Sequence, residues 1–210
     1  DREDVVGLGE SYWQAVLQEP DVYLPSMSRT LAARKSLEGH TAGATGNNLS
    51  AYVALGVTSC HEPTTSEEVL NRLRTGLHVM IREGSIRRDL EGVANIKDAG
   101  IDSRRLILVS DGLEPGELLE MGYMDAIVQK AIDCGFPPVS AVQMATLNPA
   151  EHFGLDHLLG GIAPGRFADM LVLADLETIR PETVISAGRI IARDGKPQVS
   201  PRAHTFAEPS

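Results

Sequence analysis

The chain has 210 residues, of which 42% are hydrophobic and 23% charged, ordinary values for a globular protein with one good core and a smaller appendage. Its formal charge of −10, without any long block of basic residues, argues against nucleic acid or an anionic membrane surface as a partner. No apolar run approaches the roughly 18 residues needed to span a bilayer. Two cysteines far apart in the chain indicate a reduced, cytoplasmic setting.

The first half of the chain repeats one unit, in which a short apolar run is followed by a polar or glycine-containing turn and then a helical stretch. The patterns predict helices at 12–35 (with breaks near Pro20 and Pro25), 46–55, 64–75 and 86–99. Strands are expected at 4–9, 36–39, 57–60, 77–81 and 105–110. Strands and helices that alternate in this order predict an α/β fold of the TIM-like (β/α)8 barrel type.

In the second half of the chain, the spacing of hydrophobic residues changes from a helical to a strand-like period. We expect helices at 117–121, 124–134, 139–147 and 149–153, and then strands at 169–173, 183–186 and 190–192. The predicted organisation is an incomplete metal-hydrolase (β/α) barrel over 1–160, a small β-sandwich portion over 161–199 and a flexible tail over 200–210.

The barrel is incomplete because about five strand candidates precede residue 111, whereas a closed barrel has eight. An open partial barrel would expose two unpaired strand edges, which promotes aggregation. We therefore expect the chain to be a fragment that holds the later barrel strands, with the missing N-terminal part of the same protein as its first partner.

Four residues follow predicted strands in the same manner: Glu10, His40, His61 and Asp111. In (β/α) barrels the chemistry is assembled at this end of the strands. Imidazoles mixed with carboxylates suit Zn, Mn or Fe, and a carboxylate can bridge two metals about 3.5–4 Å apart. Each residue also has a plainer interpretation. His40 could be a loop histidine, His61 an exposed strand end, Asp111 an Asp-Gly turn and Glu10 the solvated start of a helix. Their shared position favours a divalent-metal hydrolase.

The other histidines are expected to be structural: His78, His152, His157 and His204. Cys60 precedes His61, so the two side chains should face opposite sides of a strand. Arg82 and Glu83 form a charged couple at a strand end, which could recognise a polar substrate or could be a surface ion pair.

With these residues in view, the chain resembles the amidohydrolase superfamily, and within it the adenine deaminases. The matching segments are VGLGE at 6–10, EGHTAG at 38–43, SCHE at 59–62, MIREGS at 80–85, VSD at 109–111, QMATLNPAEHFGL at 143–155 and GIAPGRFADMLVL at 161–173. The likeness covers nearly the whole chain, in order. The last two segments indicate the superfamily, and the earlier ones point to adenine deaminases.

The resemblance implies a binuclear metal site, with Mn, Fe or Zn, that converts adenine to hypoxanthine and ammonia. Glu10 would bridge the metals, while His40 and His61 would bind the second metal. Asp111 would bind the first metal and shuttle the proton. Glu62 would protonate or hold the purine ring. A homo-oligomer is also expected.

Three departures from the family pattern stand out. The His-x-His pair of the family's first strand is absent, and Cys60 and Gly112 stand where relatives commonly carry Asp. We therefore expect residues 1–210 alone to be inactive or very weak. Two alternatives stay open: an amidohydrolase that acts on a cyclic amide or another amidine, and a non-catalytic remnant.

Overall fold

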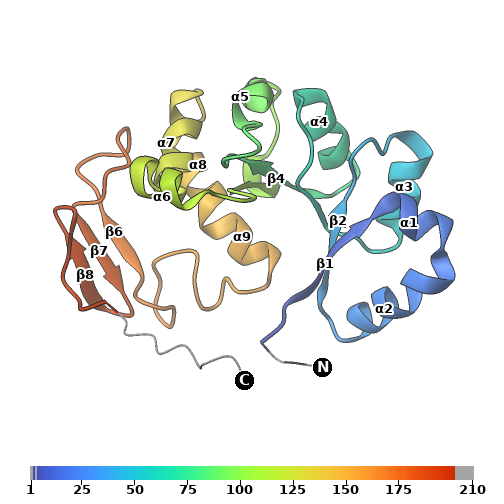
Figure 1. The fold of residues 1–210 in the computed structure, drawn as a ribbon, viewed down its shortest axis with the longest axis horizontal. Helices are drawn as coiled ribbons and strands as arrows, with labels where there is room; N and C mark the ends of the chain where they lie inside the picture. The colour runs from blue at the N-terminus through green and yellow to red at the C-terminus, as the bar shows by residue number, and fades with distance from the viewer. Residues whose placement is uncertain (1, 3, 202–210) are drawn as a thin grey trace.

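The computed structural model describes residue 2 and residues 4–201, and its larger sheet is parallel (Figure 1). The five strands of this sheet lie side by side in chain order: β1 (Gly7–Tyr12), β2 (Ser36–His40), β3 (Ser59–Cys60), β4 (His78–Arg82) and β5 (Leu106–Val109). All four strand pairs are parallel. Five parallel strands in sequential order, each followed by helix, form an arc of a (β/α) barrel, as predicted.

Helices follow every strand of the arc. They are α1 (Trp13–Gln18), α2 (Pro20–Ala32), α3 (Gly46–Ala54), α4 (Ser66–Arg74), α5 (Leu90–Val93), the 3-10 helices η1 (Ala94–Asp98) and η2 (Ser103–Arg105), α6 (Pro115–Met121), α7 (Met124–Asp133), α8 (Pro138–Ala145) and α9 (Leu147–His152). The predicted start of α4 is confirmed, because Thr65 caps the helix by accepting from the backbone N–H of Glu68.

Two expected helices differ from the prediction. The break falls only at Pro20, which occupies the first turn of α2, whereas Pro25 lies inside that helix. The helix expected at 86–99 shrinks to α5 and η1. The reason is a tight loop after β4, in which Asp89 N–H donates to the carbonyl of Arg82 (2.9 Å) and the Asp89 carboxylate binds the Arg82 side chain.

The strands of the arc have two different faces. On β2, Leu37 and Gly39 are buried against the helices, and on β4 the same is true of Val79 and Ile81. A Cβ at Gly39 would come within 2.6 Å of the carbonyl oxygen of Ser59, so only glycine fits there. Since side chains alternate along a strand, the residues in between, His40 among them, face the inner side of the arc.

A buried polar cluster closes the inner side at the start of the strands. His152 on α9 bonds both oxygens of Glu38 (2.9 and 3.1 Å) and packs against His78, with ring centroids 4.4 Å apart. Although burial opposes it, hydrogen bonds from His152, Ser36 and Ser59 hold the pKa of Glu38 below its usual range. Nearby, Asn148 donates to the carbonyls of Ser103 and Leu106. The cluster therefore ties α9 to the sheet.

His78 should make the fold acid-sensitive. Burial, and then the neighbouring His152 and Arg105, lower the pKa of His78 to about 4, and its buried Nδ1 has no partner within the described part of the chain. The unfolded chain takes up this proton near pH 6.5, so stability is lost as pH falls from about 6.5 towards 4, by about 1–3 kcal/mol. Urea unfolding of His78→Gln at pH 7 and pH 5 should show a flatter pH dependence than the parent. The exposed His157→Gln serves as control, and an unchanged slope in His78→Gln would contradict the assignment.

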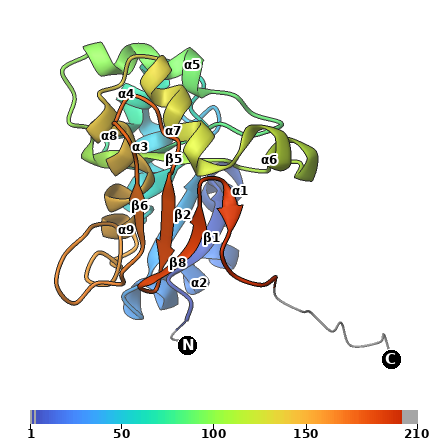
Figure 2. The same ribbon diagram turned by 90° about the vertical axis from the view of Figure 1, so that its left-hand side faces the viewer.

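The C-terminal part forms a second, antiparallel sheet. It consists of β6 (Met170–Val172), β7 (Thr183–Ser186), β8 (Arg189–Arg193) and β9 (Lys196–Pro197). This sheet lies at the end of the molecule away from α1–α3 (Figures 1 and 2). Gln129 of α7 holds it by accepting from Ile179 N–H (2.7 Å) and donating to the carbonyl of Glu177 (3.1 Å).

The fold class is confirmed as a partial barrel with a small sheet, while the exact domain limits stay predictions. Residues 202–210, which include His204 and most of the predicted tail, lie outside the described residues. Within the described part, the helices are too short or too polar to cross a membrane.

Candidate functional site

Glu10 sits in an irregular stretch of β1. The pairing of β1 with β2 shifts register between Leu8 and Ser11, and Glu10 adopts a φ of 23°. A bulge of this kind re-aims a side chain, and positive φ in a residue other than glycine is strained and concentrates at functional sites. Tyr52, fully buried on α3, supports the bulge by donating its hydroxyl to the Ser11 carbonyl. Burial raises the pKa of Tyr52 to about 12, so this hydroxyl keeps its proton.

Glu10, His40 and His61 converge at the C-terminal ends of β1, β2 and β3. Glu10 Oε1 lies 2.8 Å from His40 Nδ1 and 3.0 Å from His61 Nε2. One ligand atom from each residue falls within 4.8 Å of the others. Two imidazole nitrogens and a carboxylate oxygen at this spacing fit a divalent transition metal such as zinc, manganese or iron.

Glu62 holds His40 from the other side. One of its oxygens contacts His40 Nε2, and the other accepts from the backbone N–H of Ala42 at 2.8 Å. The Glu62 side chain is 5% exposed. A carboxylate that binds one ring nitrogen orients the histidine and leaves the other nitrogen, here Nδ1, for a metal. Tyr12 stacks on the same imidazole, with ring centroids 4.0 Å apart. His40 is therefore fixed on three sides.

Asp111 lies in the loop that follows β5. His61 lies in the loop that follows β3, so the loop after β4 lies between them in the chain. Asp111 has a φ of 47° and precedes Gly112. Asp111 is therefore a carboxylate at the end of a strand and also the first residue of an Asp-Gly turn, so both interpretations of the sequence apply. Its Oδ2 accepts from Arg82 Nη1 at 3.2 Å, while Arg82 Nε donates to Asp89 Oδ2 at 2.8 Å. Asp111 lies outside the close group of Glu10, His40 and His61. The structure thus brings three of the four candidates together and gives the fourth an arginine partner.

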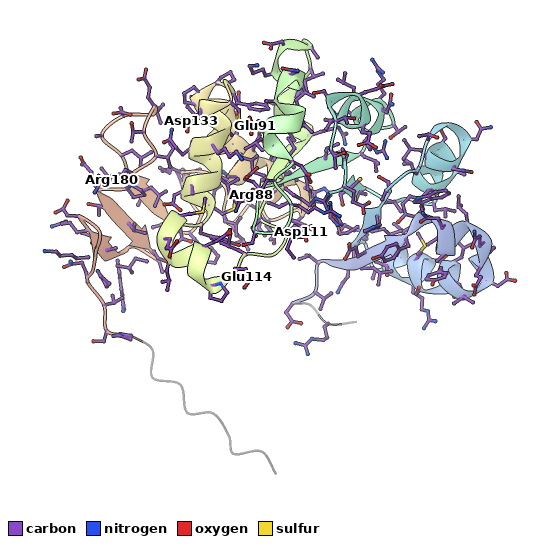
Figure 3. The ribbon with its side chains drawn as sticks, turned by 45° about the horizontal axis from the view of Figure 1, so that its top comes forward. Arg88, Glu91, Asp111, Glu114, Asp133 and Arg180 are labelled. Carbon is purple, nitrogen blue, oxygen red and sulfur yellow. The ribbon has the colours of Figure 1, made fainter. Side chains whose placement is uncertain are left out.

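The loops after β4 and β5 are joined next to Asp111 (Figure 3). Ser85 N–H donates to the carbonyl of Gly112 (3.0 Å), and Ser85 Oγ accepts from Glu114 N–H (2.7 Å). A Cβ at Gly84 would lie 2.0 Å from the carbonyl oxygen of Ser110, so glycine is required for this contact. The joint fixes the position of the Asp111 turn.

Glu83 points away from its neighbour Arg82. Its Oε1 accepts from Lys130 Nζ of α7 at 2.7 Å, and its Oε2 is buried and has no partner among the residues that the structure describes. Glu83 and Lys130 line a cavity of about 120 Å³ between the β4 loop, α6 and α7. The couple expected from the sequence is therefore not an ion pair between Arg82 and Glu83, since each residue pairs elsewhere.

Cys60 faces away from the group formed by Glu10, His40 and His61, as expected from its place beside His61. The thiol is fully buried and lies 2.5 Å from Thr41 Oγ1. Burial raises the pKa of Cys60, so the thiol stays neutral. A residue at this position would not reach a substrate on the inner side of the arc.

Other residues around the site gave no signal in the sequence. Tyr52, Thr41, Arg72 and Asp89 act on the candidate residues through contacts between elements, and each looks like an ordinary helix or loop residue locally. The spacing of strand ends predicted that Glu10, His40 and His61 lie together, but not the groups that hold them.

Comparison with known proteins gives a family match and several close relatives. The model described as "Amidohydrolase family" matches residues 27–191. A curated protein named adenine deaminase from Cenarchaeum symbiosum is 42% identical over 99% of this chain, which covers 34% of that protein. The adenine deaminase of Moorella thermoacetica is 41% identical over 91% of this chain, covering 33% of its own length. The chain thus spans about a third of these relatives.

Solved structures with the same fold are more distant in sequence. A beta-aspartyl dipeptidase from Fervidobacterium islandicum superposes with a TM-score of 0.69 at 16% identity, covering 95% of this chain and 61% of that one. An N-acetylglucosamine-6-phosphate deacetylase from Pasteurella multocida gives 0.67 at 14% identity, covering 88% and 56%. At these identities the likeness concerns the fold alone.

Proposed function

This chain belongs to the amidohydrolase family, and we propose that it forms the central and C-terminal part of an enzyme that deaminates adenine to hypoxanthine and ammonia. The remaining part of the enzyme would be supplied by a further segment of the same protein. The relatives named adenine deaminase support the substrate, because they are about 40% identical over nearly all of this chain.

The observation that carries the proposal is the convergence of Glu10, His40 and His61. Family membership implies a divalent metal, these three residues would hold it, and Glu10 would also bridge to a second ion. Asp111 would contribute to the other ion. When bound, the metal pair supplies Lewis-acid activation of water at neutral pH.

Asp111 is proposed to handle the proton in the reaction. Its carboxylate would accept a proton as water adds to C6 of adenine and would return it to the amino nitrogen, so that the C6–N bond breaks and ammonia leaves. Arg82 restrains Asp111 through one N–H and is itself anchored by Asp89. This arrangement limits the directions in which the carboxylate can turn.

Glu62, Arg82 and Glu83 are proposed to contact the purine. Glu62 combines this role with orienting His40, because one of its oxygens lies on the imidazole. Arg82 is 7% exposed on the inner side of the arc. Glu83 points the other way, into the cavity beside α6 and α7, where its second oxygen has no partner among the described residues and would accept an N–H donor only from that side.

The proposal predicts metal content and ammonia release together. The full-length protein should bind two divalent ions per subunit and release ammonia rapidly from adenine, measured by metal analysis and a coupled ammonia assay. Two ions with ring opening of a hydantoin-like cyclic amide, and no release from adenine, would contradict the substrate and favour another amidohydrolase. A protein that binds no metal would contradict the enzyme and favour a non-catalytic remnant.

A further inference from the structure

Arg72 is the bulkiest of the fully buried side chains in the part of the chain that the structure describes. It belongs to the last turn of α4 and is 2% exposed. A guanidinium group stays charged under all ordinary conditions, so its burial is costly unless its donors are satisfied. In the described residues its side-chain hydrogen bonds go to Thr41 alone, and it has no carboxylate partner.

The two bonds from Arg72 reach the residue next to His40. Nη2 donates to the Thr41 carbonyl at 2.9 Å, and Nε donates to Thr41 Oγ1 at 3.3 Å. The planar fork of arginine can make both bonds at once, which an ammonium on a flexible stem does less well. Arg72 therefore restrains the backbone and side chain of Thr41, directly after the end of β2.

Thr41 also contacts the neighbouring strand β3. Its hydroxyl lies 2.5 Å from Cys60 Sγ, and Cys60 directly precedes His61. Thr41 and Cys60 are fully buried on the helix side of the sheet, whereas His40 and His61 face the inner side. The chain of contacts from Arg72 through Thr41 to Cys60 thus joins the ends of β2 and β3 directly behind the two imidazoles.

We propose that Arg72 is a positioning residue for the metal site, which sets the spacing of His40 and His61 from the outer side of the sheet. The inference rests on the proposed metal site and adds a residue that contacts neither metal nor substrate. A role limited to stabilising α4 would lower the unfolding temperature and leave the metal affinity of the folded protein unchanged. Metal affinity therefore separates the two roles.

The test measures the affinity of the full-length protein for Co²⁺ in competition with a chelator. Ligand-field absorption of Co²⁺ reports the bound ion. The measurement is made at a temperature where circular dichroism shows that each variant is folded. Arg72→Met should weaken binding by about 10-fold, the lower end of the range known for groups that hydrogen-bond directly to a metal ligand, because Arg72 acts through Thr41. Arg72→Lys should fall between Met and the parent. Arg74→Met is the matched control, because Arg74 is exposed on the same helix and should bind as the parent does.

Thr41→Val provides a second variant that keeps Arg72 and removes only the hydroxyl. It should weaken Co²⁺ binding several-fold, and it decides the question if Arg72→Met does not fold. Parent-like affinity in the folded Arg72→Met variant, or in Thr41→Val when Arg72→Met is unfolded, would overturn the inference while leaving the proposed function intact. A parent protein that binds no Co²⁺ would overturn the metal site and this inference with it.

Discussion

Replacing Asp111 with asparagine is expected to lower the turnover of adenine by about 10²- to 10⁴-fold, the range that general acid–base groups contribute. The amide has nearly the same shape as the carboxylate but cannot accept a proton from the attacking water. Arg82 keeps its second partner in this variant, because its Nε is bound to Asp89 at 2.8 Å. The loop should therefore keep its position while the chemistry is lost.

The measurement is steady-state ammonia release by the full-length protein, together with its metal content. Asp111→Asn should retain metal and lose turnover, which separates a proton-transfer defect from simple loss of the ions. Asp98→Asn is the control, since Asp98 lies on the surface and pairs with its neighbour Lys97 at 2.9 Å. Near-normal turnover in Asp111→Asn would refute the proton-shuttle role.

The sequence was sufficient to predict the arc of parallel strands and the convergence of three of the four candidate residues. A buried strand such as β5 has a strong local pattern, and all parallel strands end at one edge of the sheet. For this reason Glu10, His40 and His61 could be expected to meet, although 30 positions separate Glu10 from His40 and 21 separate His40 from His61.

The features that the sequence did not predict depend on contacts between elements. Arg72 lies in a helix rich in charged residues and reads as a solvent-facing side chain, yet it is buried against Thr41. The stretch at 86–99 has a helical pattern, but the bond between Arg82 and Asp89 draws its first residues into a loop. The bulge at Glu10 arises from pairing with β2, which no local pattern reports.

The same distinction explains why the sequence does not predict the contact of Glu62 with His40. It follows His61 directly, so its reach toward His40 of the preceding strand is invisible in the chain order. In the folded protein its two oxygens lie on His40 and on the Ala42 N–H. The carboxylate of Glu62 thus contacts the imidazole of His40, and any contact with the proposed purine substrate would be made by a carboxylate that is already held in place.

Replacing His61 with alanine should abolish binding of the ion held by Glu10, His40 and His61. His61 Nε2 lies 3.0 Å from Glu10 Oε1, and its loss leaves one imidazole and one carboxylate from this chain. Even the removal of an outer partner weakens metal binding 10- to 100-fold, so loss of a ligand should weaken it more than about 100-fold.

Metal analysis of the full-length variant after exposure to a weak chelator should show about one ion fewer per subunit than the parent. His157→Ala, which removes an exposed imidazole bonded to the Gly154 carbonyl, should keep full stoichiometry. If His61→Ala also kept it, His61 would be no ligand, and the site would have to be built from Glu10 and His40 with residues from elsewhere in the protein.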